Sequence, residues 1–187
     1  CVEPDPDFVG LVNPHLSPAL DAWLQDPRVR LVHRDPRSFM RRINARYDVI
    51  LMNMGDPITA QMNRFYTKEF FTHAGQRLLP GGIFSFAVSG GESMLGPTQA
   101  RFLGSIKKTL LQVFPKTLIY PGDRIRFFAT DGTGELLSNP ATLADRISQR
   151  NLELTYIRED ILRDALSPFR LDYLDSILSE TTGTAVN

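Results

Sequence analysis

Short apolar runs alternate along the chain with stretches in which apolar residues recur every three or four positions. The runs YDVILMN (47–53) and IFSFAVS (83–89) are rich in β-branched and aromatic residues and predict buried strands. Residues 67–79 (TKEFFTHAGQRLL) predict a helix, because the apolar residues fall on one face and Thr67 can cap the first turn. Strands that alternate with helices indicate βαβ units. We therefore expect an α/β fold with a doubly wound, mostly parallel sheet.

The remaining elements follow from the same patterns. Further helices are expected within LSPALDAWLQDP (16–27), PRSFMRRINAR (36–46) and PTQARFLGSIKKTLLQVF (97–114), and further strands at 29–35, 117–120 and 124–130. The last two strands flank a turn at Pro121-Gly122-Asp123, and we expect the final strand to be antiparallel. LPGG (79–82) is interpreted as a turn. The expected organisation is an α/β domain over 1–137, a helical extension over 138–180 and a disordered tail over 181–187.

Composition narrows the class of ligand. The 187 residues suit one domain, and 21 basic residues balance 21 acidic residues, so the formal net charge is zero. This balance argues against a protein that binds nucleic acid through phosphate contacts and favours a small-molecule ligand. Cys1 is the single cysteine, and the three histidines show no ligand spacing, so no metal site is expected. No apolar run approaches the ~18 residues of a membrane span. The chain opens at Cys1 without a methionine, and we expect it to be the later part of a longer protein.

The candidate chemistry lies where the expected strands end. In parallel α/β sheets, ligands bind outside the carboxyl ends of the strands. Glu3, Asp35, residues 53–56 and residues 89–92 occupy those positions. An acidic side chain there can accept hydrogen bonds from both ribose hydroxyls, which suits Glu3. Asp35 could accept a hydrogen bond from an exocyclic amine such as adenine N6, although an Asp before a helix is more often an N-cap.

The order of these segments resembles a known family. Glu3, RDPRSFM (34–40), YDVILMNMGDP (47–57), FYTKEFF (65–71) and LLPGGIF (78–84) follow one another as they do in the spermidine synthase (polyamine aminopropyltransferase) family. YPGDRIRF (120–127) resembles the family's Tyr-Pro turn and the strand after it. The resemblance runs from residue 1 to about residue 130 and is especially close to bacterial members fused to membrane segments. It implies the class I S-adenosylmethionine-dependent methyltransferase fold, which is Rossmann-like.

The resemblance also implies roles for individual residues. Glu3 would hold the ribose of decarboxylated S-adenosylmethionine, or of its thioether product, and Asp35 would hold the adenine. Asp56 would bind an amine of the polyamine acceptor, Glu92 would line the same cavity, and Tyr120 would flank the acceptor. Carboxylates suit a dicationic acceptor because charge-assisted hydrogen bonds are strong in a partly desolvated groove. The implied partners are small molecules, without nucleic acid or metal. The implied location is cytoplasmic, including as the cytoplasmic domain of a membrane-fused protein.

Asn53 departs from the family's pattern. In the family's reaction an amine of putrescine attacks the methylene beside the sulfonium, which gives spermidine and methylthioadenosine. The first Asp of an Asp-x-x-Asp-Pro motif takes the amine's proton, and Asn53 stands at that position. An amide can orient an amine but cannot accept its proton, and loss of a general base costs about 10²–10⁴-fold in rate. Three interpretations stay open: Asp56 or a water serves as base, the chain transfers a methyl group from S-adenosylmethionine to another acceptor, or it is a non-catalytic binding or structural domain.

A second departure precedes Glu3. The fold implied by the resemblance has a first strand followed by a Gly-rich loop, and neither stands before Glu3. Without that strand, interior strands would present unpaired edges, which favour pairing with another chain. We expect the chain to form a homodimer, to exchange strands with another copy, or to close the gap that the missing strand leaves in the sheet. We also expect the chain by itself to bind nucleoside poorly.

Overall fold

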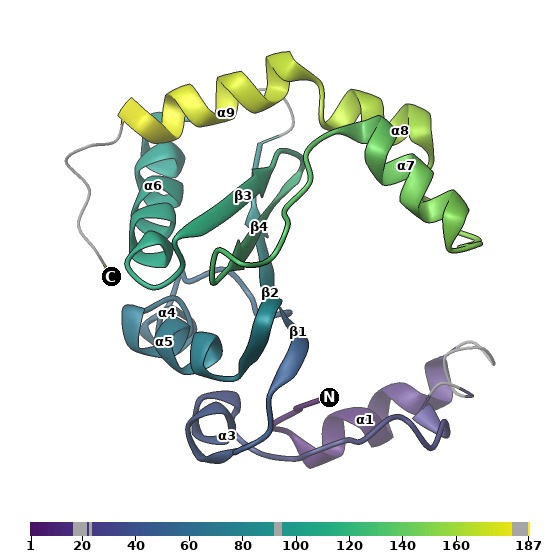
Figure 1. The fold of residues 1–187 in the computed structure, drawn as a ribbon. Helices are drawn as coiled ribbons and strands as arrows, with labels where there is room; N and C mark the ends of the chain where they lie inside the picture. The colour runs from purple at the N-terminus through teal and green to yellow at the C-terminus, as the bar shows by residue number, and fades with distance from the viewer. Residues whose placement is uncertain (17–21, 23, 92–94, 181–186) are drawn as a thin grey trace. The chain divides into compact units, whose positions relative to one another are not determined.

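The computed structural model describes residues 1–16, 22, 24–91, 95–180 and 187. These residues form two compact units, Cys1–Ala45 and Arg46–Asn187. The first unit is purple to dark blue in Figure 1, and the second runs from blue to yellow.

The first unit is built from short elements. Its helices are α1 (Pro6–Val12), the 3₁₀ helix η1 (Asn13–His15) and α3 (Pro36–Arg42). The strand expected at 29–35 is reduced to an isolated parallel bridge between Val2 and Val32. Half of the residues of the helix expected within 16–27, namely 17–21 and 23, lie outside the described residues. Met40 is the one buried apolar residue in the described part of this unit, so its apolar core is small.

The second unit contains a four-stranded sheet. Its strands are β1 (Tyr47–Met52), β2 (Leu78–Ser89), β3 (Lys116–Tyr120) and β4 (Arg124–Thr130), in the order β1-β2-β4-β3. β1 and β2 are parallel, whereas β4 is antiparallel to both β2 and β3. The α/β class and the antiparallel closing strand are confirmed. The described sheet is mixed, with one parallel pair.

The helices of the second unit begin where local caps allow. They are α4 (Ala60–Asn63), α5 (Lys68–Gln76), α6 (Pro97–Leu111), α7 (Pro140–Gln149), α8 (Glu159–Ala165) and α9 (Pro168–Glu180). The Thr67 side chain accepts a hydrogen bond from Phe70 N, as expected for the N-cap of α5. α9 lies against α6 (Figure 1). Leu174 and Leu178 of α9 are buried, and Lys107 of α6 forms an ion pair with Asp175 of α9.

Phenylalanine rings fill the space between the sheet and its helices. Phe86 of β2 stacks on Phe127 of β4 with ring centroids 4.9 Å apart, and Phe71 of α5 stacks on Phe86 at 5.7 Å. Phe84 stacks on Phe114, which follows α6. These rings are almost wholly inaccessible to solvent. Burial of this aromatic surface fixes α5 and α6 on the sheet, and so fixes the loops that leave its strands.

The expected turn at LPGG is wrong, because these residues belong to the start of β2. Tyr47 N donates to Arg77 O, and β1 runs alongside β2 from that point. A Cβ at Gly82 would come within 2.9–3.1 Å of three carbonyl oxygens, those of Leu79, Asp48 and Tyr47. Glycine is therefore needed here for close backbone approach between β1 and β2 rather than for a turn.

Among the helices of the described residues, none combines the length and apolar character that crossing a membrane requires.

Candidate functional site

The strand register places several loops at one edge of the sheet in the second unit. β1 and β2 are parallel, so their carboxyl ends, Met52 and Ser89, lie at the same edge. Ser89 pairs with Arg124 and Tyr120 pairs with Arg126, which brings the β3–β4 turn to that edge as well. The predicted residues Asn53, Asp56 and Tyr120 therefore share this edge.

Asp56 is tied to the end of β2. Its half-buried carboxylate accepts a hydrogen bond through Oδ1 from Ser89 N at 3.0 Å. Within the described residues, this is the one hydrogen bond recorded for the carboxylate. Gln99 of α6 donates to Ser89 O at 3.0 Å, so the end of β2 is held from the other side. The arrangement presents a fixed, partly desolvated negative charge, which suits a cationic ligand.

Gly90 lets the β3–β4 turn approach the end of β2. Its N–H donates to Asp123 O at 2.7 Å. A Cβ at this position would lie 2.4 Å from Gly122 O and 2.8 Å from Ile125 Cγ1, distances that a real side chain does not reach. Glycine is therefore required here, and it holds the turn against the loop that follows β2.

Tyr66 supports the segment that carries Asn53 and Asp56. Asn53 is exposed directly after β1. The Tyr66 side chain is fully buried, and its hydroxyl donates to Gly55 O at 2.9 Å. Burial, together with the negative charge of Asp56, raises the pKa of Tyr66 to about 12, against an opposing effect of Arg124. The family resemblance assigned no role to Tyr66. The signal was its place in FYTKEFF, just before the capped start of α5.

Tyr120 is engaged with the loop after β4. It is half-buried, its hydroxyl donates to Leu137 O, and its ring lies 4.9 Å from the ring of Phe128. Burial raises the pKa of the Tyr120 phenol, so the neutral form predominates. With the hydroxyl occupied, the ring is the part of this side chain that a ligand could contact. Glu92, predicted to line the same cavity, lies outside the described residues.

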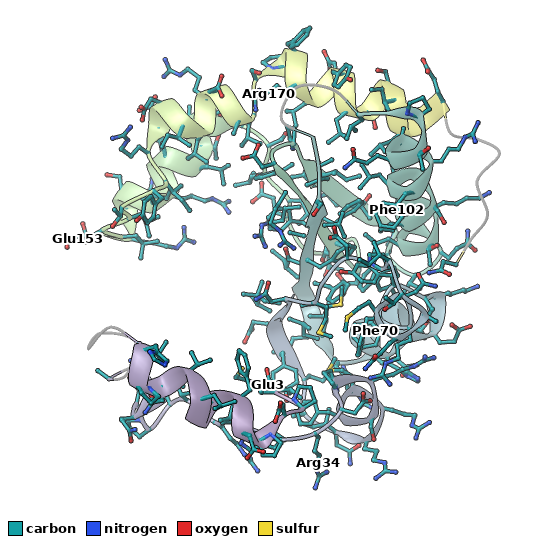
Figure 2. All side chains as sticks on the ribbon, turned by 180° about the vertical axis from the view of Figure 1, so that it is seen from behind. Glu3, Arg34, Phe70, Phe102, Glu153 and Arg170 are labelled. Carbon is teal, nitrogen blue, oxygen red and sulfur yellow. The ribbon has the colours of Figure 1, made fainter. Side chains whose placement is uncertain are left out.

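Glu3 and Asp35 belong to the first unit, where each has a local partner. Glu3 N donates to Val32 O, and Glu3 Oε1 accepts from Asp5 N at 3.0 Å. Asp35 Oδ1 accepts from Ser38 N at 2.9 Å and caps α3, so the N-cap interpretation is correct for this oxygen. The parallel bridge from Val2 to Val32 places Glu3 and Asp35 after two adjacent parallel segments. Glu3 is labelled in Figure 2.

A search of the described residues for three or more His, Cys, Asp or Glu side chains arranged to hold a metal ion finds no such group. The oxygens of Glu3, Asp35 and Asp56 are hydrogen-bond acceptors for hydroxyl and amine groups. Each of these carboxylates can therefore accept hydrogen bonds from the hydroxyl or amine groups of a ligand.

Comparison with known proteins agrees with this chemistry. A family model described as the spermine/spermidine synthase domain matches residues 2–121. The polyamine aminopropyltransferase of Synechococcus sp. (strain JA-2-3B'a(2-13)) is 32% identical over 114 residues, which are 60% of this chain and 35% of that protein. The polyamine aminopropyltransferase of Mycobacterium tuberculosis H37Rv is 28% identical over 181 residues, 91% of this chain and 34% of that protein. The chain thus spans about a third of the length of these two relatives.

Solved structures share the fold. The crystal structure of spermidine synthase from Thermotoga maritima has a TM-score of 0.67 and 19% sequence identity, covering 96% of this chain and 59% of that one. Human methyltransferase-like protein 13 in complex with SAH has a TM-score of 0.60 and 19% identity, covering 86% of this chain and 76% of that one. At such identities the likeness shows the fold alone, which is the expected methyltransferase-like α/β fold. The family assignment comes from the family model, which matches well over half of the residues: the chain belongs to the spermine/spermidine synthase family.

Proposed function

We propose that the protein transfers an aminopropyl group from decarboxylated S-adenosylmethionine to putrescine. The observation that carries this proposal is the half-buried Asp56 carboxylate, held by Ser89 N at the carboxyl edge of β1 and β2 within the residues that match the family model. A carboxylate so placed can bind a protonated amine through a charge-assisted hydrogen bond.

The transfer is a single displacement. The lone pair of a putrescine amine forms a C–N bond with the methylene beside the sulfonium, and the C–S bond breaks. Methylthioadenosine leaves as a neutral thioether, and the new secondary amine is that of spermidine. One proton must leave the attacking amine, because only the unprotonated amine is a nucleophile.

Glu3 and Asp35 are the residues we propose for the nucleoside of the co-substrate. The residue types fit, because each side chain carries a carboxylate, and Glu3 Oε1 and Asp35 Oδ1 already act as hydrogen-bond acceptors for Asp5 N and Ser38 N. A carboxylate accepts hydrogen bonds from ribose hydroxyls or from an exocyclic amine. We assign the ribose to Glu3 and the adenine amine to Asp35. When bound, the sulfonium supplies the electrophilic carbon and the leaving group.

Asp56, Glu92 and Tyr120 are the residues we propose for the acceptor. Asp56 would bind one ammonium group, and Glu92 would contribute a second negative charge for a diamine. Tyr120 would offer its ring face, since its hydroxyl is already bonded to Leu137 O. An ammonium group over an aromatic ring gains a cation–π interaction.

Asn53 is the residue we propose to orient the attacking amine. Its side chain lies directly after β1, three residues before Asp56, and an amide oxygen can accept a hydrogen bond from the amine. Because this amide cannot take the proton, we propose that the proton leaves to water. The transfer would then be slow, by about 10²–10⁴-fold relative to an enzyme with a carboxylate at this position.

Methyl transfer from S-adenosylmethionine to another acceptor is the second candidate, and Asn53 is the observation that favours it. An acceptor that is not an alkyl ammonium group would not need a base at position 53 to remove a proton from such a group. The two functions release different thioethers, methylthioadenosine from aminopropyl transfer and S-adenosylhomocysteine from methyl transfer. A domain that binds without catalysis would release neither.

The test is product analysis with the full-length protein. The protein is incubated with decarboxylated S-adenosylmethionine and putrescine, and separately with S-adenosylmethionine and a set of other candidate acceptors, and both thioethers are quantified by mass spectrometry. We expect methylthioadenosine and spermidine in equal amounts in the first reaction. S-adenosylhomocysteine in the second reaction without methylthioadenosine in the first would replace the proposal by methyl transfer. Neither product, together with no nucleoside binding by calorimetry, would leave a structural role.

We also propose that the chain forms a homodimer through β1. β1 is an edge strand of the four-stranded sheet, and its Val49 and Leu51 are 52% and 70% exposed. An exposed apolar edge strand favours pairing with a second copy. Leu51→Lys should then shift the mass measured by light scattering from dimer to monomer, and a monomeric wild-type protein would contradict this proposal. We further propose a cytoplasmic location, which the resemblance to the spermidine synthase family implies.

A further inference from the structure

The residue that ends the printed sequence, Asn187, is hydrogen-bonded to the turn between α4 and α5. Asn63 Nδ2 donates to Asn187 Oδ1 at 3.1 Å, and Asn187 Nδ2 donates back to Asn63 Oδ1 at 2.7 Å. Asn187 Nδ2 also donates to Tyr66 O at 3.2 Å. The side-chain amides of Asn63 and Asn187 therefore form a reciprocal pair, and the amide of Asn187 also donates to the backbone carbonyl of Tyr66.

The backbone of Asn187 is bonded as well. Asn187 O accepts from Lys68 N at 3.0 Å, and Asn187 N donates to the hydroxyl of Thr109 at 2.9 Å. Lys68 N is one of the N–H groups that a helix leaves unpaired in its first turn, so Asn187 satisfies a donor that α5 itself cannot. Thr109 is fully buried in α6, and its hydroxyl donates a hydrogen bond to Ser105 O at 2.7 Å. Asn187 thus joins α4, α5 and α6.

A single residue, Tyr66, connects this contact to the candidate acceptor segment, residues 53–56. Tyr66, whose carbonyl oxygen bonds to Asn187, donates its hydroxyl to Gly55 O, and Gly55 precedes Asp56. A shift of the α4–α5 turn would move the Tyr66 ring, and with it the support of residues 53–56. The ring is fully buried among aromatic neighbours and has little freedom to compensate.

We propose that Asn187 is a positioning residue for the acceptor side of the site, acting through Tyr66 on Asp56; this inference rests on the proposed aminopropyl transfer. Asn187 does not touch the reacting atoms. It holds the α4–α5 turn so that the Asp56 carboxylate stays in place for an ammonium group. Asn187 is then part of the functional architecture of the second unit.

The reciprocal pair offers a matched test. Asn187→Asp removes both donations from Nδ2, to Asn63 Oδ1 and to Tyr66 O. Asn63→Asp makes the same change of amide to carboxylate but leaves the bond from Asn187 to Tyr66 O intact. Ser176→Ala, which removes a hydrogen bond within α9, controls for general loosening of the C-terminal helices.

Two measurements on the full chain decide the inference. Hydrogen–deuterium exchange should accelerate about 3- to 10-fold across residues 54–70 in Asn187→Asp, less in Asn63→Asp and not in Ser176→Ala. The KM for putrescine should rise by a similar factor in Asn187→Asp, with kcat changed less than about twofold, because binding rather than chemistry is affected.

Each result counts for or against the inference. Unchanged exchange in Asn187→Asp, or an Asn63→Asp effect as large, would overturn it. Faster exchange with an unchanged KM would show a purely structural contact and would also overturn it. If no protein, wild type included, forms methylthioadenosine, the proposed function fails. Exchange alone then decides whether Asn187 holds this turn, with acceleration across 54–70 in support and no change against.

Discussion

The Tyr66 hydroxyl donates a hydrogen bond to the carbonyl oxygen of Gly55 at 2.9 Å. This bond connects the residue before the α5 cap to the residue before Asp56. The candidate site thus rests on a buried phenol rather than on the loop alone, since the loop after β1 is itself largely exposed.

Tyr66→Phe should destabilise the fold by about 0.5–1.5 kcal/mol, because Gly55 O loses its partner while the ring stays packed. Urea unfolding monitored by circular dichroism measures this change. Tyr156→Phe is the control, since Tyr156 is 83% exposed and its hydroxyl should contribute little. Equal stability losses in the two variants would show that the bond to Gly55 is not a stabilising contact.

The Tyr66 phenol should make stability fall at alkaline pH. Its pKa is about 12 in the folded chain, raised first by burial and then by Asp56, against about 10 in the unfolded chain. Between these values the unfolded chain releases the proton while the folded chain keeps it, so the contribution is complete below the unfolded pKa and is lost as pH rises towards the folded one. Absorbance titration of tyrosinate should show a late-titrating phenol that Tyr66→Phe removes. If every phenol titrates near its ordinary pKa, this environment is assigned wrongly.

Asp56→Asn should weaken acceptor binding with little effect on folding. The new amide oxygen can still accept the hydrogen bond from Ser89 N, but the negative charge is lost. We expect the KM for putrescine to rise roughly 10- to 100-fold, the range for a hydrogen bond to a charged group. Asp48→Asn, a change of the same charge at an exposed position in β1, should leave KM unaltered. Equal effects of the two changes would point to long-range electrostatics rather than direct contact.

Gly90→Ala should be among the more damaging small substitutions. The added Cβ would meet Gly122 O at 2.4 Å, so the β3–β4 turn must move away from the end of β2. We expect a loss of about 1–3 kcal/mol in the free energy of unfolding. Gly10→Ala provides the contrast, because nothing lies within 4 Å of the added Cβ and alanine favours a helix by roughly 0.5–1 kcal/mol. A tolerated Gly90→Ala would contradict the close approach described for this turn.

Local signals were enough to predict several elements. Thr67 before an apolar stripe marks the start of α5, and Pro97 opens α6, because caps and first-turn prolines act within a few residues. The strand expected at 124–130 matches β4, and the strand expected at 47–53 runs one residue beyond β1, since their apolar runs are bounded by turn residues.

Other features depend on contacts between distant residues and could not be predicted locally. The glycines of LPGG indicate a turn, yet Gly82 is needed because the backbone of β1 passes beside it. α1, which was not expected, begins where Asp5 accepts from Asp7 N, a short cap in a proline-rich stretch. The strand expected at 29–35 keeps only the Val32 bridge.

The site was predicted in part, by position rather than by contact. The edge at which residues 53–56 lie followed from the order of the strands, whereas the place of Tyr120 beside the acceptor came from the resemblance alone. The hydrogen bonds from Ser89 N to Asp56 and from Tyr66 to Gly55 did not, because the first spans 33 residues and the second depends on how α5 packs on the sheet. The reciprocal pair of Asn63 and Asn187 joins residues 124 apart in the sequence, and no local sequence pattern around either residue predicts it.

The most direct test of the account is the rate of methylthioadenosine formation by the full-length protein and by Asn53→Asp, with decarboxylated S-adenosylmethionine and putrescine. A carboxylate at position 53 can take the proton that the amide cannot, so we predict slow formation by the wild type and a rate about 10²–10⁴-fold higher in the variant. Asn63→Asp, the same change at a residue outside the reaction, should give no such increase. Equal rates in wild type and Asn53→Asp, or no methylthioadenosine from either, would contradict the assignment of an aminopropyl-transfer site that has lost its base.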